Sequence, residues 1–192
     1  IWKEGEFVPW ADAQVHLLSL AVQFGTSVFE GIRCYQTSRG PAIFRLPEHI
    51  RRLRDSCAIY RMPPAQDQAA LEEACRAVVR RNGLGDCYIR PMVLRGYGSA
   101  GLNPEASPVE TWVAAWPWGT YLGPEALERG VDVCVSSWQR AAPNTFPVSA
   151  KAGGHYVNAQ LIKMQALADG YAEGIALSPG GLVSEGSGQN LF

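Results

Sequence analysis

One lysine stands within a short run of small residues in the second half of the chain. The run spans residues 149–154 (SAKAGG) and places Lys151 among alanines and glycines. A lysine amine attacks a carbonyl carbon only in its neutral form, and a confined, partly dry pocket favours that form. The small neighbours leave room for a bound molecule. Lys151 is therefore predicted to form a Schiff base with an aldehyde, although an inert lysine beside a glycine turn is the alternative for this run taken alone.

A carboxylate follows a short predicted strand near the end of the chain. Glu185 lies in the run SEGSGQNLF over residues 184–192. Pyridoxal phosphate acts as an electron sink while its ring nitrogen keeps a proton, and a buried carboxylate commonly holds that proton in place. Taken alone, Glu185 would be an ordinary glutamate at the end of a strand. Together with Lys151 it supplies the parts that a pyridoxal phosphate site requires, and the pair predicts that cofactor.

The composition limits the class of protein. The chain has 192 residues, of which 47% are hydrophobic, enough for a core in one large or two small domains. Lys and Arg number 17 against 18 Asp and Glu, so no basic face suggests nucleic acid or a membrane surface. Five scattered cysteines without a Cys-x-x-Cys pair argue against a zinc site or a disulfide framework. With no membrane span or secretory signal in sight, a cytoplasmic protein with small-molecule partners is expected.

The spacing of apolar residues predicts both helices and strands in the first half of the chain. The alternating strand over 87–94 places Tyr88, Arg90 and Met92 on one face. Asp67 is the expected N-cap of a helix that Asn82 and Gly83 end. The loop over 96–108 is expected to cross the surface or to reach a neighbouring subunit. The predicted elements are a hairpin over 1–8, a strand over 29–35, helices over 48–60 and 67–82, and strands over 87–94 and 112–116.

The second half is predicted to be a separate domain. A strand over 131–137, a helix from 155 or 156 to 169 and a hairpin over 173–185 are expected. The segment that follows residue 116 has the composition of a connection between two domains. It predicts a domain over 1–116, an interdomain segment over 117–130 and the first part of a larger domain over 131–192. In the helix, the positions expected to face inward are Val157, Leu161, Met164 and Leu167.

Several runs in the chain carry a family resemblance. They are FGTSVFEGIRCY at 24–35, YIRP at 88–91, WGTYLG at 118–123 and RAAPNT at 140–145, in addition to the runs around Lys151 and Glu185. In this order they resemble the fold-type IV pyridoxal phosphate enzymes, and most closely the branched-chain amino acid aminotransferases. The resemblance covers essentially the whole chain. It implies an α/β (α+β) fold with a small N-terminal α/β domain and the beginning of a larger pseudo-barrel domain.

The resemblance also implies roles around the cofactor. Lys151 would be the catalytic residue and the covalent anchor, and Glu185 would contact the ring nitrogen. Arg52 would hold the phosphate group, which suits a guanidinium, and Tyr156 would donate a hydrogen bond to the phenolic oxygen of the cofactor. From the residues alone, Arg52 would be one of several solvated arginines and Tyr156 a packed tyrosine.

A second set of residues is implied for substrate binding. Tyr88 would meet the α-carboxylate of the amino acid and Arg90 the distal carboxylate of glutamate. Phe29, Trp118 and Tyr121 would line the apolar part of the pocket, although each aromatic side chain could equally belong to an ordinary core.

The function implied is transamination between leucine, isoleucine or valine and 2-oxoglutarate, giving a branched-chain 2-oxo acid and L-glutamate. A D-amino acid aminotransferase, an aminodeoxychorismate lyase and an R-selective amine transaminase of the same fold are the alternatives within this class. A non-catalytic α/β binding protein is the alternative from a different class. The resemblance further implies a homodimer or a multiple of dimers.

The ends of the chain and one substitution qualify the expected site. Because the chain starts at Ile1 and stops at Phe192 within a predicted strand, a fragment is expected, with further phosphate and substrate contacts in the missing segment. Phe24 stands where many of the resembling enzymes carry a tyrosine. Weaker use of glutamate or a more apolar preference is expected, and unchanged Michaelis constants in a Phe24→Tyr variant would argue against this expectation.

Overall fold

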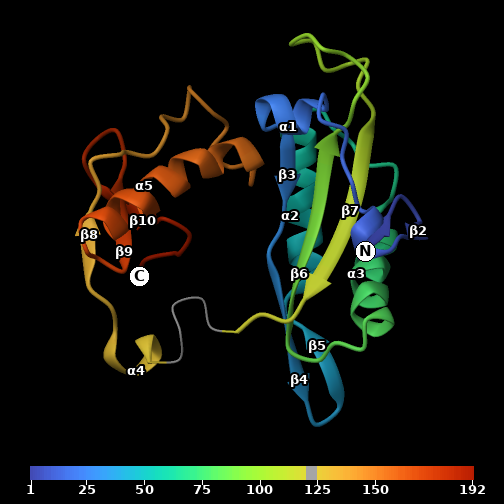
Figure 1. The fold of residues 1–192 in the computed structure, drawn as a ribbon, viewed down its shortest axis with the longest axis horizontal. Helices are drawn as coiled ribbons and strands as arrows, with labels where there is room; N and C mark the ends of the chain where they lie inside the picture. The colour runs from blue at the N-terminus through green and yellow to red at the C-terminus, as the bar shows by residue number, and fades with distance from the viewer. Residues whose placement is uncertain (120–124) are drawn as a thin grey trace. The chain divides into compact units, whose positions relative to one another are not determined.

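A computed structural model describes residues 1–119 and 125–192 (Figure 1). The chain divides into two compact units, each described here by itself. The first unit comprises Ile1–Trp118 together with Ser149–Gly154, the segment that we call the lysine loop. The second comprises Gly119–Val148 and His155–Phe192. The division into domains at 117–130 stays a prediction.

The first unit is built on an antiparallel sheet. Within the described residues it has seven strands in the order β2-β1-β7-β6-β4-β5, with β3 paired to β6. The long strands β6 and β7 run side by side through its middle (Figure 1). The strands are β1 (Trp2–Lys3), β2 (Glu6–Phe7), β3 (Ser27–Phe29), β4 (Ile32–Thr37), β5 (Gly40–Ile43), β6 (Cys87–Arg95) and β7 (Val109–Trp116).

Two long helices cover one face of this sheet and bury the core. They are α2 (Leu46–Ile59), behind the strands in Figure 1, and α3 (Gln68–Arg81), beside β7, and the short α1 (Leu20–Phe24) lies at the end of the sheet. The predicted N-cap is confirmed, because the carboxylate of Asp67 accepts a hydrogen bond from the Ala70 amide at 2.8 Å. The inward stripes of both helices pack on the sheet, and their fully buried members include Ile50, Leu53, Leu71, Cys75 and Val78.

The strand predicted over 29–35 is interrupted rather than continuous. Phe29 pairs with Met92 and Ile32 pairs with Ile89, so the register is the same on both sides of the interruption. The amide of Glu30 still donates to the carbonyl of Pro91 at 2.9 Å. Pro91 has no N–H to return the second bond, and the ladder opens at this point. The prediction of a single strand was therefore wrong at this point, where one hydrogen bond of the ladder is missing. The side chain of Glu30 is buried here.

The second unit carries a smaller sheet. Its strands have the order β10-β9-β8, with β8 parallel to β9. The strand predicted over 131–137 is shorter than expected. The elements are α4 (Ala126–Arg129), β8 (Val133–Val135), α5 (Tyr156–Ala168), β9 (Glu173–Leu177) and β10 (Val183–Gly186); short 3-10 turns lie at Trp10–Asp12 and Gly153–His155.

The inward face predicted for α5 was wrong. Its buried residues are Ala159, Ile162 and Ala166, whereas Val157, Met164 and Leu167 are exposed and Leu161 is half-buried. A Cβ added to Gly174 on β9 would lie 2.8 Å from Ile162 Cγ2. The small alanines and this glycine let the helix approach β9 closely, and that close contact outweighs the larger apolar stripe. Among the described helices none is both long and apolar enough to span a bilayer.

Candidate active site

The main chain of Lys151 is fixed on two sides within the first unit. Its carbonyl accepts a hydrogen bond from the Phe29 amide at 3.0 Å, and its amide donates to the hydroxyl of Ser56 on α2 at 3.1 Å. The next residue, Ala152, forms an antiparallel bridge with Val28. The lysine loop therefore lies alongside the edge of β3 and is hydrogen-bonded to it. The ammonium nitrogen of Lys151 lies 5.2 Å from the centre of the Phe29 ring.

The lysine loop also passes very close to the end of α1. Gly25 ends that helix in the left-handed region with φ of 69°, and a Cβ there would lie 3.0 Å from the Cα of Gly154. A side chain at Gly25 would therefore be strained by its own backbone and by the loop. The glycine permits the approach that places Lys151.

Gly25→Ala is accordingly expected to lower the free energy of unfolding by about 1–3 kcal/mol. Gly154→Ala is the matched control, because its Cβ would meet only the Gly25 carbonyl at an ordinary 3.5 Å. The control is expected to stay within about 1 kcal/mol of the parent protein. Urea unfolding of both variants measures the difference, and equal losses would contradict the close approach.

One face of β6 brings four of the predicted substrate residues together. As predicted, Tyr88 and Arg90 share a face, and Arg90 donates from Nη2 to the Tyr88 hydroxyl at 3.2 Å. The guanidinium carbon of Arg90 lies 4.4 Å from the centre of the Phe29 ring, and the rings of Tyr88 and Trp118 are 5.0 Å apart. Phe29 thus contacts two cationic side chains, Arg90 and Lys151. This face offers a guanidinium, a phenol and aromatic surface to one bound molecule.

The Arg90 guanidinium has an unmet hydrogen-bonding group. Its Nε is buried and makes no hydrogen bond to any residue in the described part of the chain. Buried N–H groups in proteins are almost always paired, and a carboxylate is the natural acceptor for a guanidinium. The arrangement is chemically suited to a carboxylate ligand.

Arg52 is held by a buried carboxylate that the sequence reasoning did not single out. The Nε and Nη2 of Arg52 contact the two carboxylate oxygens of Glu30 at 2.5 and 2.7 Å, and Nδ1 of His49 lies 2.8 Å from the same carboxylate. Glu30 is fully buried, while the side chain of Arg52 is 53% exposed. Ser56, whose hydroxyl accepts the hydrogen bond from the Lys151 amide, lies one helical turn after Arg52 on α2. Arg52 and the lysine loop are therefore positioned by the same helix.

Burial and pairing act in opposite directions on Glu30. Burial is the largest single influence and would raise the pKa of its carboxyl, but the hydrogen bonds and charges of Arg52 and His49 together outweigh it. The net effect holds the pKa of Glu30 below its ordinary value of 4.5. The carboxylate is therefore charged at neutral pH and fixes the direction of Arg52.

Glu30→Gln is expected to lower the free energy of unfolding at neutral pH by about 1–3 kcal/mol, a loss limited by the solvent around Arg52. A carboxyl with a lowered folded pKa contributes stability above its unfolded pKa, and that stability is lost as the pH falls below 4.5 through the folded value. The variant should therefore lose less stability on acidification than the parent. Glu48→Gln, which removes an exposed partner of Arg45, is the control and should change stability by less than about 0.5 kcal/mol. Parallel acid dependences for Glu30→Gln and the parent protein would contradict the assignment.

The remaining cofactor candidates lie in the second unit. Tyr156 is the first residue of α5, and Glu185 lies in β10 opposite Ala176. The side chain of Glu185 is 45% exposed, and its Oε1 lies 3.0 Å from Nε of Arg140. Lys151 belongs to the first unit. Tyr121 lies outside the described residues.

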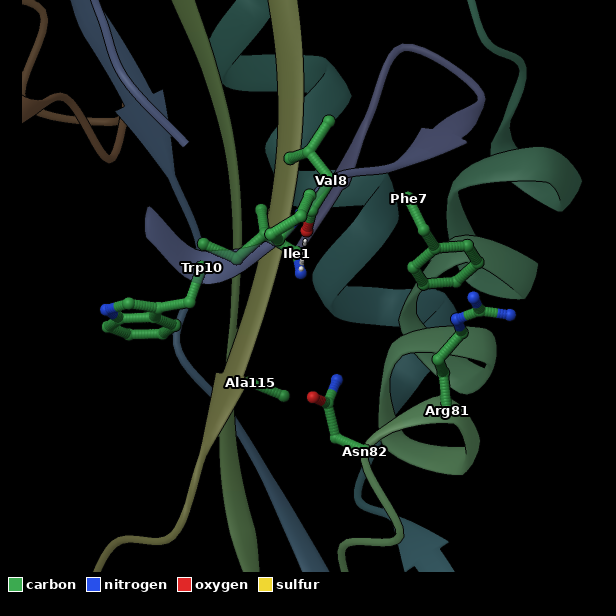
Figure 2. A pocket seen from close by; sticks show the side chains of 8 residues that line it. Ile1, Phe7, Val8, Trp10, Arg81, Asn82 and Ala115 are labelled. Atoms are coloured by element: carbon green, nitrogen blue, oxygen red, sulfur yellow. Dashed lines mark hydrogen bonds between the residues drawn. The ribbon is translucent and has the colours of Figure 1, made fainter. Parts of the chain in front are cut away.

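A surface pocket lies in another part of the first unit. It has a volume of about 300 Å³ and is lined by the N-terminal hairpin and the end of α3 (Figure 2). Arg81 stands beside the ring of Phe7, with its guanidinium carbon 5.1 Å from the ring centre, and Asn82 faces Ala115. None of the predicted site residues lines this pocket.

The cysteines have structural surroundings. Cys34 and Cys87 are paired across β4 and β6 and are fully buried. Burial raises the pKa of the Cys87 thiol to about 12, so it stays protonated and is a poor nucleophile. In the ranges that the structure describes, no group of three or more His, Cys, Asp or Glu side chains could hold a metal ion.

Sequence reasoning missed the residues that orient the expected site. Glu30 could have been found, because a glutamate between Phe29 and Ile32 in an apolar stretch must be paired if it is buried. Ser56 and Arg140 carry no such signal, since their contacts join segments far apart in the chain.

Comparison with known proteins places the chain in a family. The family described as Amino-transferase class IV matches residues 27–192. The branched-chain-amino-acid aminotransferase of Escherichia coli strain K12 is 54% identical over 193 aligned positions, which cover all of this chain and 62% of that protein. The chain thus spans less than two thirds of the length of this relative.

Solved structures agree with that match. A crystal structure of the Escherichia coli branched-chain amino acid aminotransferase is similar with a TM-score of 0.95 and 53% identity, over 97% of this chain and 62% of that one. The T.th. enzyme of the same name, complexed with N-(5'-phosphopyridoxyl)-L-glutamate, gives a TM-score of 0.91 and 47% identity, over 97% of this chain and 61% of that one. These matches confirm the predicted α/β (α+β) fold of the fold-type IV enzymes. The chain belongs to the class IV aminotransferases.

Proposed function

We propose that this protein transfers the amino group of leucine, isoleucine or valine to 2-oxoglutarate and releases the branched-chain 2-oxo acid and L-glutamate. The observation that carries the proposal is the 54% identity to a branched-chain-amino-acid aminotransferase over the whole of this chain. The lysine loop and the face of β6 that carries Tyr88 and Arg90 support it, because they supply the amine and the guanidinium that this reaction needs.

The donor set of the chain fits pyridoxal phosphate. Lys151 offers an amine beside an aromatic ring, Arg52 a half-exposed guanidinium with a fixed direction, and Glu185 a half-exposed carboxylate. We propose that they hold the aldehyde carbon, the phosphate group and the ring nitrogen, respectively, and that Tyr156 donates to the phenolic oxygen. When bound, this cofactor delocalises the electron pair left behind on removal of the substrate α-proton.

Lys151 then has a second task. With the amino acid bound, the neutral Nζ of Lys151 would accept the substrate α-proton and would later donate a proton back. The hydrogen bonds of its main chain to Phe29 and Ser56 keep the side chain at one place along β3 during this transfer. Lys151 therefore acts as anchor and as general acid and base.

The face of β6 is proposed to bind both substrates. The Arg90 guanidinium, with its buried Nε, receives the distal carboxylate of glutamate or 2-oxoglutarate, and Tyr88 meets the α-carboxylate. Phe29, Trp118 and Tyr121 form the apolar wall for the branched side chain. The related enzyme complexed with a phosphopyridoxyl-glutamate adduct supports glutamate as one of the two partners.

A panel of amino donors tests the proposal. The full-length protein with pyridoxal phosphate and 2-oxoglutarate is expected to use L-leucine, L-isoleucine and L-valine at least about 100-fold better in kcat/KM than D-alanine or an R-amine. Turnover of D-alanine, of an R-amine or of aminodeoxychorismate in place of the L-amino acids would favour one of the related activities of this fold. Failure to bind the cofactor would favour a non-catalytic protein.

The surroundings of the enzyme are part of the same proposal. We propose a homodimer, or a multiple of dimers, in the cytoplasm, with amino acids and 2-oxo acids as its partners. We further propose a small N-terminal domain over 1–116, a connection over 117–130 and a cofactor domain from 131 onward. Light scattering of the full-length protein tests the oligomeric state, and a monomer under assay conditions would contradict it.

A further inference from the structure

The guanidinium of Arg140 is contacted from several directions in the second unit. Its Nη2 donates to the carbonyls of Gly186, the last residue of β10, and of Ser187 at 2.7 and 3.2 Å. Its Nη1 donates to Oδ1 of Asn158 on α5 at 3.1 Å. Its Nε lies 3.0 Å from Oε1 of Glu185, in an ion pair without the alignment of a hydrogen bond, and only 16% of the side chain is exposed. All three nitrogens of the planar fork therefore have an oxygen partner.

The main chain around Arg140 is anchored as well. Its amide donates to the Leu177 carbonyl at the end of β9 at 2.9 Å. The side-chain Nδ2 of Asn158 donates to the main-chain carbonyl of Gln139 at 2.9 Å. Arg140 is thus tied to the end of β9, the first turn of α5 and the end of β10, and its guanidinium has little freedom to move.

The loop after β10 has a second, independent support. Gln189 donates to the carboxylate of Glu173 at 2.9 Å, and its carbonyl accepts the Gly186 amide at 2.9 Å. Lys163 forms an ion pair with the same Glu173 at 3.1 Å. This support fixes the main chain of the loop but does not touch the carboxylate of Glu185. The orientation of that carboxylate rests on the ion pair with Arg140.

We propose that Arg140 is a positioning residue that holds the carboxylate of Glu185 toward the ring nitrogen of pyridoxal phosphate. The inference rests on the proposed function, in which Glu185 meets that nitrogen. A half-exposed glutamate at the end of a strand would otherwise sample several rotamers, and an immobile guanidinium at its base removes most of that freedom. The carboxylate oxygens are then oriented before the cofactor binds, so the side chain of Glu185 loses less conformational entropy on binding.

A double-mutant cycle on the full-length protein tests this role. The variants are Arg140→Met, Glu185→Gln and the combination, with Arg76→Met on the exposed face of α3 as the matched control for loss of an arginine. Equilibrium dialysis measures the dissociation constant of pyridoxal phosphate, and the melting temperature of the cofactor-free protein reports changes in folding. Arg140→Lys is the fallback if Arg140→Met does not fold, because it keeps the charge but loses the fork.

Arg140→Met or Arg140→Lys is expected to weaken cofactor binding about tenfold, as is usual for a residue that orients a ligand through another residue. In the Glu185→Gln background the same change should weaken binding by less than about twofold, because the carboxylate to be oriented is gone. Equal fold-changes in the two backgrounds would overturn the inference and leave Arg140 a structural residue. If the parent protein itself does not bind pyridoxal phosphate, the proposed function fails instead.

Discussion

Replacing Lys151 by alanine is expected to lower kcat for leucine and 2-oxoglutarate by roughly 10⁴-fold or more. The variant loses the covalent anchor and the proton-transfer group together. Its fold should be preserved, because the main-chain hydrogen bonds of Lys151 to Phe29 and Ser56 remain when the side chain is shortened. Steady-state assays with saturating pyridoxal phosphate measure the loss.

The control for this prediction is another lysine of the first unit. Lys3 lies on β1, pairs with Glu110 at 3.3 Å and has no part in the proposed site. Lys3→Ala is expected to keep kcat within about twofold of the parent value, as surface changes commonly do. A Lys151→Ala variant that retained more than about a tenth of the parent kcat would exclude the assigned role.

Arg90→Met is expected to separate the two half-reactions. The substitution keeps an unbranched side chain beside Phe29 but removes the guanidinium, leaving the distal carboxylate of 2-oxoglutarate without its partner. The value of kcat/KM for 2-oxoglutarate should fall about 10²–10³-fold, corresponding to a broken charge pair in a buried site. The value for leucine in the first half-reaction, which carries no distal carboxylate, should fall less than about tenfold.

Single-turnover kinetics with each substrate measure this difference. Arg76→Met on α3 is the matched control, since Arg76 is half-exposed and pairs only with neighbouring glutamates of its own helix among the contacts described. It should leave both half-reactions unchanged. Equal losses with leucine and 2-oxoglutarate in Arg90→Met would assign Arg90 to the α-carboxylate or to packing instead of to the distal carboxylate.

Local patterns predicted much of the first unit. The helix after Asp67 and the shared face of Tyr88 and Arg90 follow from one capping carboxylate and from strict alternation, and both are present. The alternation rule failed where Pro91 on the neighbouring strand removed one donor opposite Glu30. A strand can be read from its own residues, but its hydrogen bonds also depend on a partner strand that lies far away in the sequence.

The prediction of the buried face of α5 failed for a different reason. Its largest apolar residues, Met164 and Leu167 among them, form a regular stripe, yet the helix packs through Ile162 and Ala166 against Gly174. Close approach of two backbones requires small residues on both elements, and a periodicity argument that weights size and hydropathy selects the opposite face. The partner glycine is not visible to that argument.

The proposed reacting groups could be named from the sequence, but the residues that contact them could not. Lys151 stands out because its neighbours in the sequence are small. Glu185 stands out because it follows a short predicted strand. Glu30 contacts Arg52 and Arg140 contacts Glu185, and both contacts join segments that only the folded chain brings together. Supporting contacts of this kind decide how precisely a site is built.

The central claim is that the amine of Lys151 carries the cofactor, and reduction with borohydride tests it most directly. Purified full-length protein should show a visible absorption band that borohydride removes, and peptide mapping should then place one stable phosphopyridoxyl group on Lys151. A protein without that band after incubation with pyridoxal phosphate, or with the label on another lysine, would contradict the account.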